Sequence, residues 1–123
     1  MIDLQVSDIR TFIPSSDFEL SKDFYGALGF EVDAIDANLA LLSVGDHAFY
    51  LRRYYVKDWA ENSMLYLTVA DAQACFEQID ALLSGGRFPG ARVAAPKREA
   101  YGAVVTYVWD PAGVLLHLAQ WDE

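Results

Sequence analysis

Hydrophobic and polar positions follow the same order of patterns in both halves of the chain. Residues 9–14 (IRTFIP) predict a strand, and a capping box over Ser16–Glu19 predicts the start of a helix with an apolar stripe at Leu20, Phe24 and Leu28. Gly29 is placed to end this helix. Three short strands are predicted next, over residues 30–35, 39–44 and 48–52. The first half therefore reads as a βαβββ unit.

The second half repeats this order. A strand is predicted over residues 64–69, and Asp71 is the expected N-cap of a helix that ends near Ser84, before the Gly85-Gly86 pair. Further strands are predicted over residues 92–95, 103–109 and 114–119. Runs of three strands after each helix favour antiparallel pairing and an α+β class over a doubly wound sheet. We expect one domain over residues 1–123, with modules at about 8–54 and 63–121.

The last strand carries a single histidine. In DPAGVLLHLAQ (Asp110 to Gln120), Asp, Pro and Gly occupy the first, second and fourth positions of a type I turn. The β-branched and aromatic residues 103–109 precede this turn and predict a hairpin. A hairpin turning on these four residues places His117 near Thr106 and puts Tyr107 and Trp109 on the opposite, helix-covered face.

Composition and charge narrow the classes of partner. The chain has 123 residues and a formal net charge of −9, which argues against nucleic acid and anionic membrane surfaces and mildly favours cationic ligands. Cys75 is a lone cysteine in an apolar helical stripe, so we expect a core residue and no disulfide. The N-terminus shows no basic segment or long apolar run, which predicts a cytoplasmic protein.

The duplicated βαβββ unit and two motifs resemble the vicinal oxygen chelate superfamily of glyoxalases, bleomycin-resistance proteins and dioxygenases. The motifs are D-x-x-x-S-x-x-F-Y-x-x-L-G-F over Asp17 to Phe30, and Y-G…D-P-x-G over Tyr101 to Gly113. This resemblance implies two paired modules that form an open, barrel-like concavity, which is the glyoxalase/bleomycin resistance fold. It also implies that the binding site lies in that concavity.

The residues at the superfamily's four metal-ligand positions decide the predicted class. The resemblance places Arg10, Tyr50, Met64 and His117 at these positions. Arginine has no free lone pair, methionine suits soft metals, and tyrosine must first lose a proton that titrates near pH 10. Only His117 is a good ligand for a hard divalent ion. We therefore predict a protein without a metal or another cofactor.

The non-enzymatic branch of the superfamily fits these substitutions best. The resemblance implies a homodimer that sequesters a cationic, planar aromatic drug, as bleomycin-resistance proteins do, with His117 as a polar wall of the cavity. The stretch from Arg52 to Tyr66 (RRYYVKDWAENSMLY) mixes rings and charges suited to stacking. Its rings could equally seal a module or dimer interface. The predicted ligand-binding residues are Arg10, Tyr50, Arg52, Trp59, Met64, Tyr66, Tyr101 and His117.

Two enzymatic alternatives stay open. One is a glyoxalase-like lyase or isomerase, or a dioxygenase-type enzyme, of the same superfamily, which requires metal ligands at other positions. The other is a metal-free enzyme in which His117 acts as general base while Arg10 or Arg52 holds an anionic substrate.

Overall fold

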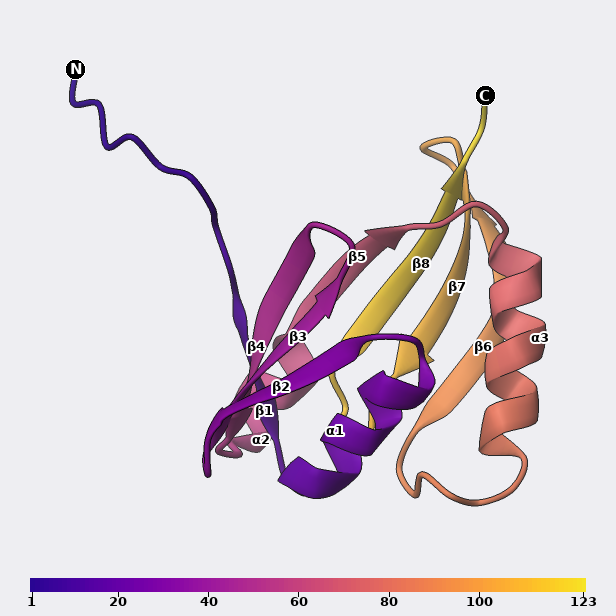
Figure 1. Ribbon diagram of the computed structural model, residues 1–123. Helices are drawn as coiled ribbons and strands as arrows, with labels where there is room; N and C mark the ends of the chain where they lie inside the picture. The colour runs from indigo at the N-terminus through magenta and orange to yellow at the C-terminus, as the bar shows by residue number, and fades with distance from the viewer.

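The computed structural model describes all 123 residues and contains two open four-stranded sheets (Figure 1). The first sheet has the order β1-β4-β3-β2, formed by β1 (Phe12–Ser15), β2 (Glu31–Asp36), β3 (Leu39–Val44) and β4 (His47–Arg53). The second has the equivalent order β5-β8-β7-β6, formed by β5 (Met64–Thr68), β6 (Arg92–Glu99), β7 (Ala103–Trp109) and β8 (Leu115–Trp121). The predicted α+β class and duplicated βαβββ order are confirmed.

One long helix accompanies each sheet, and each begins at an aspartate. The side chain of Asp17 accepts a hydrogen bond from the Leu20 amide at the start of α1 (Phe18–Ala27), one residue after the Ser16 expected to open the capping box. Asp71 accepts from the Ala74 amide at the start of α3 (Ala72–Leu83), as predicted. Gly29 follows α1 with a φ of +106°, a conformation that a side chain would strain.

A third, short helix was not predicted. Helix α2 (Lys57–Asn62) lies in the segment that joins the two modules, and no side chain caps its start. The residues around it are aromatic and charged without a helical stripe, so the sequence shows no periodic signal there. Its position next to β1 comes from tertiary packing.

The hydrophobic core joins the two modules. Along each strand, alternate side chains turn toward the helices, so that Ile13, Leu51 and Leu42 of the first sheet share one cluster with Leu116 and Val108 of the second. The rings of Phe24 in α1 and Phe88 in the loop after α3 meet edge to face at 5.4 Å. Cys75 is partly buried against this cluster, in line with its predicted place in the core.

A buried polar contact also crosses between the modules. The Tyr25 hydroxyl on α1 donates to Asp110 Oδ2 at 2.7 Å, and both side chains are fully buried. Asp110 Oδ1 accepts from the amides of Ala112 and Val114 at 2.8 and 3.0 Å. The aspartate of the D-P-A-G turn therefore holds its own turn together and ties α1 to the second sheet.

Residues 1–11 extend away from the rest of the molecule as an arm (Figure 1). Thr11 carries the last backbone contact of this arm with a strand, since its carbonyl accepts from the Tyr50 amide. The predicted strand over residues 9–14 thus begins three residues later, at Phe12. The apolar side chains of the arm are exposed, at 85% for Ile2, 77% for Leu4 and 62% for Val6.

Candidate functional site

The second sheet presents a row of aromatic side chains on the face turned away from α3. Tyr66 of β5, His117 of β8 and Tyr107 of β7 are directly paired across the three strands. The His117 ring lies 5.4 Å from the Tyr66 ring and 5.0 Å from the Tyr107 ring, measured between centroids. His117 therefore stands between two tyrosines, and we call this side of the second sheet the concave face.

The register of this hairpin corrects part of the sequence prediction. Tyr107 and Trp109 lie on the concave face with His117, whereas Thr106 is buried on the opposite face, where its hydroxyl donates to the Ala72 carbonyl at the start of α3. The Gly113 amide donates to the Asp110 carbonyl, as in the predicted turn, but Gly113 has a φ of +99° and belongs to the loop as an additional, left-handed residue. The loop is therefore one residue longer than predicted, so that His117 pairs with Tyr107 in place of Thr106. A shift of one residue reverses which face each side chain of a strand points to.

Both ring nitrogens of His117 are buried and have no hydrogen-bond partner. Buried polar atoms normally find a partner, because leaving one unpaired costs about 1–3 kcal/mol. The rings of Tyr66 and Tyr107 cover the imidazole but offer it no donor or acceptor. His117 therefore has hydrogen-bonding capacity that the protein itself does not use.

Hydroxyl and carboxylate oxygens gather at one end of the row. The Tyr66 and Tyr101 hydroxyls are 3.1 Å apart, and the Tyr107 hydroxyl donates to Glu99 Oε1 at 2.8 Å. Burial, the bond to Tyr101 and the charge of Glu99 raise the pKa of Tyr66 to about 12. Burial and the bond to Glu99 raise the pKa of Tyr107 to about 12 as well. Both phenols thus stay neutral at physiological pH beside a negative charge.

Trp121 completes the aromatic group with Tyr66 and Tyr101. Its ring centroid lies 5.2 Å from that of Tyr101 and 6.2 Å from that of Tyr66. The three side chains are 46–51% exposed, so their rings are open to a ligand. We call Tyr66, Tyr101, Tyr107, His117, Trp121 and Glu99 the aromatic platform.

Three members of the platform were missed by the sequence analysis. Tyr107 was assigned to the wrong face, and β6 and β8 continue past their predicted ends to Glu99 and Trp121. Trp121 could have been included from its residue type, because an aromatic residue two positions past the predicted end favours a longer strand. Glu99 carried no such signal, since Pro96 and the bulge between Ala94 and Lys97 interrupt the pattern of β6.

Two other predicted residues meet on the first sheet. Arg10 donates to the Tyr50 hydroxyl at 2.9 Å, and its guanidinium also pairs with Asp8 at 2.6 Å. The ring of Phe12 stacks on that of Tyr50, with centroids 5.0 Å apart. The hydrogen bond that Arg10 donates to the Tyr50 hydroxyl is the main reason that the pKa of Arg10 is raised. Arg10 is therefore already engaged by an acid and a phenol.

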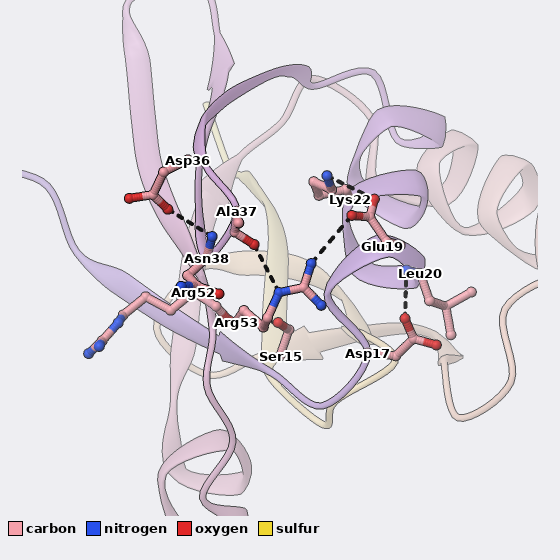
Figure 2. Close-up of polar contacts among 10 residues, drawn as sticks. All are labelled: Ser15, Asp17, Glu19, Leu20, Lys22, Asp36, Ala37, Asn38, Arg52 and Arg53. Atoms are coloured by element: carbon pink, nitrogen blue, oxygen red, sulfur yellow. Dashed lines mark hydrogen bonds and ion pairs between the residues drawn. The ribbon is translucent and has the colours of Figure 1, made fainter.

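Arg52 and Trp59 form a third group. The Arg52 guanidinium lies over the Tyr54 ring, 5.4 Å from its centroid, and the rings of Tyr54 and Trp59 are 6.2 Å apart. Figure 2 shows Arg52 pointing away from α1, whereas Arg53 turns toward it, donates to the Ala37 carbonyl and pairs with Glu19. Arg52 has no acidic partner and keeps its charge available.

The predicted ligand-binding residues thus fall into separate groups. On the second sheet, Tyr66 contacts both Tyr101 and His117. Met64 at the start of β5 is 61% exposed, and at the same end of this sheet the Arg92 guanidinium lies over the Trp109 ring. No hydrogen bond, ion pair or ring contact joins these residues to Arg10 and Tyr50. A groove of about 550 Å³ between the modules includes Tyr66 but none of the other predicted residues.

The side chains at the four superfamily positions do not fit a divalent metal ion. Arg10 brings a positive charge to Tyr50, whose hydroxyl accepts its hydrogen bond, and Met64 lies on the other sheet with His117. Nowhere in the structure do three His, Cys, Asp or Glu side chains gather in a geometry that could hold a metal ion. The chemistry that this face offers is stacking, hydrogen bonding and the Glu99 carboxylate, which pairs loosely with the Lys97 ammonium at 3.8 Å.

Solved structures resemble this chain over almost its whole length. A bleomycin-binding protein in complex with bleomycin has 24% sequence identity and a TM-score of 0.75, covering 95% of this chain and 100% of its own. The bleomycin resistance determinant encoded on transposon Tn5 has 27% identity, the same TM-score and the same coverage. An antibiotic-binding protein from a Streptomyces species has 20% identity and a TM-score of 0.76, covering 98% and 100%.

The chain has the glyoxalase/bleomycin resistance fold. The resemblance to the vicinal oxygen chelate superfamily drawn from the sequence is therefore confirmed at the level of the fold. No protein-family model and no curated protein matches the sequence. No helix of the structure is long and apolar enough to cross a membrane.

Proposed function

We propose that this protein is a metal-free binding protein that sequesters a cationic, aromatic small molecule, as antibiotic-resistance proteins of this fold do. The aromatic platform carries this proposal, because Tyr66, Tyr101 and Trp121 leave about half of their surface open to a flat ligand. Two of the solved structures named above are a bleomycin-binding and an antibiotic-binding protein, which supports a binding role.

Charge favours a cation over an anion at this platform. The chain carries a net charge of −9, and Glu99 is the acid nearest to the tyrosine hydroxyls. A cation is attracted by such a field over a distance of about 8 Å at physiological ionic strength. Rings that stack on a flat cation then add an attraction that salt does not screen.

We also propose that the protein acts as a homodimer, and the N-terminal arm supports this. Ile2, Leu4, Val6 and Ile9 follow one another along this arm with 62–85% of their surface exposed, and polar residues stand between them. Exposed apolar residues in such a row need a surface to cover them. Strands β1 and β5 are edge strands whose free sides could pair with another chain.

A titration with ligands of different charge tests the proposed function. Bleomycin, flat aromatic cations and flat aromatic anions are added to the protein, and binding is followed by thermal shift and calorimetry. We expect cations to bind, and binding to weaken as salt is raised from low to physiological concentration. A preference for anions, unchanged by salt, refutes the proposal.

Such a preference would favour the metal-free enzyme instead. That alternative rests on His117, whose ring nitrogens have no partner in the protein and one of which is free to accept a proton from a substrate. Arg52, which has no acidic partner, would then anchor the anion. Metal analysis tests the other alternative, because a stoichiometric metal that survives dialysis and disappears in His117→Ala supports a superfamily metalloenzyme.

A further inference from the structure

The far end of the concave face has its own small cluster, separate from the main core. Ala103, Val105 and Ala119 are fully buried there although they point away from α3. The small side chains form a floor, and Tyr107 packs against it. Trp121 lies beside this floor because it is paired with Ala103 across β7 and β8.

One carboxylate and one ammonium group lie at the rim of this floor. Glu99 is paired with Ala103 on the neighbouring strand, and its side chain is only 21% exposed. The Lys97 ammonium is 3.8 Å from Glu99 Oε1, while its side chain is 72% exposed. This is a loose surface pair, of a kind that contributes little to stability. The same Glu99 oxygen also accepts the Tyr107 hydroxyl.

The geometry points to an alkylammonium site at this end of the platform. We propose that a ligand ammonium group binds beside Glu99, with the Tyr101 and Trp121 rings as walls, and that it displaces the Lys97 ammonium. Aromatic rings and a carboxylate are the groups that hold quaternary and primary ammonium ions in proteins. This inference rests on the proposed function, and it names the part of the ligand that the negative end of the platform recognises.

The Lys97 ammonium then competes with the ligand ammonium for Glu99 and lowers the affinity for the ligand. Its long chain keeps the ammonium near Glu99 without a second acceptor, so displacement costs one weak ion pair. The other nearby charges are already paired, because Arg98 makes a two-point contact with Asp122 at 2.9 and 3.1 Å. Glu99 is therefore the carboxylate that we expect a ligand ammonium group to pair with.

A matched pair of probes separates the ammonium site from ring stacking. The first is naphthalene with a trimethylammonium-ethyl tail, and the second replaces this tail by its uncharged tert-butyl analogue of the same shape. Both are titrated into the full-length protein by calorimetry and tryptophan fluorescence. We expect the charged probe to bind about tenfold more tightly than the neutral one.

Two variants with matched controls locate this preference. Glu99→Gln keeps an oxygen for the Tyr107 hydroxyl, and we expect it to remove most of the tenfold preference. Asp80→Asn on the exposed side of α3 makes the same change in net charge and should leave the preference intact. Lys97→Met should tighten only the charged probe, about two- to fivefold. Lys57→Met on α2 is its control and should have no such effect.

Each outcome supports or overturns a defined claim. Equal binding of the two probes by the unmodified protein refutes the ammonium site and leaves the proposed binding function intact. An equal loss in Glu99→Gln and Asp80→Asn also refutes the site, because the effect then comes from net charge alone. Failure of both probes to bind refutes the aromatic platform as a ligand site, and with it the proposed function.

Discussion

The Tyr25–Asp110 contact makes the sharpest prediction about stability. Both side chains are fully buried, and the contact joins α1 to the turn between β7 and β8. Tyr25→Phe keeps the ring and removes only the hydroxyl, so it leaves Asp110 Oδ2 without a partner. A hydrogen bond to a charged group is worth about 1.5–3 kcal/mol, which is the expected loss in free energy of unfolding.

Substitutions of Asp110 should differ strongly from each other. Asp110→Ala leaves the Tyr25 hydroxyl and the amides of Ala112 and Val114 unpaired, which should cost roughly 3–5 kcal/mol. Asp110→Asn keeps an oxygen for the two amides and can donate to the Tyr25 oxygen, so we expect a loss of about 1 kcal/mol or less. Urea unfolding measures these differences, which correspond to roughly 3–5 °C in Tm for each kcal/mol.

The same pair predicts a dependence on pH. Burial raises the pKa of Asp110 above its ordinary value, although its hydrogen bonds act in the opposite direction. Between about pH 4, where the unfolded carboxyl titrates, and the raised folded pKa, the folded chain binds more protons. The Asp110 contribution should therefore favour folding as pH falls through this window, and Asp110→Asn should lose this slope.

Two results would refute this reasoning. One is a Tyr25→Phe variant within about 0.3 kcal/mol of the unmodified protein, because the buried carboxylate would then not depend on the hydroxyl. The other is an Asp110→Asn variant as unstable as Asp110→Ala, which would mean that the oxygen contacts of the turn do not carry the effect. A double-mutant cycle with both substitutions measures the coupling directly.

Three further predictions concern single side chains and the arm. His117→Phe removes two buried nitrogens that have no hydrogen-bond partner, so this variant should unfold at an equal or higher urea concentration. A loss of more than about 1 kcal/mol in the free energy of unfolding would mean that these nitrogens do have partners. Thr106→Val removes the buried bond from the Thr106 hydroxyl to the Ala72 carbonyl and should cost about 1 kcal/mol in urea unfolding, and a gain in stability would argue against this bond. Deleting residues 1–8 should convert a dimer into a monomer in light scattering, whereas an unmodified chain that is already monomeric at micromolar concentration refutes the dimer.

Local patterns predicted most of the elements because the forces that select them are local. The Asp71 cap and the terminal Gly29 act within one turn of a helix, and β3 and β7 begin and end at their predicted residues. The place of His117 on the last strand also followed from the pattern after the D-P-A-G turn. The Tyr66 ring lies beside that of His117, and the Tyr66 hydroxyl contacts that of Tyr101, whereas their role in binding stays a prediction.

The amino-acid sequence by itself determined the order of elements, the duplicated module and the absence of a good metal-ligand set at the superfamily positions. Only the tertiary structure decided the register of the last hairpin, which set Tyr107 beside His117 and sent Thr106 to the opposite face. It also decided the partners of Glu99, Trp121 and Arg52. The physical reason is that strand faces alternate with a period of two, so one left-handed glycine in a loop reverses a whole strand. Contacts between distant strands depend on that register, and the register depends on the packing of both modules.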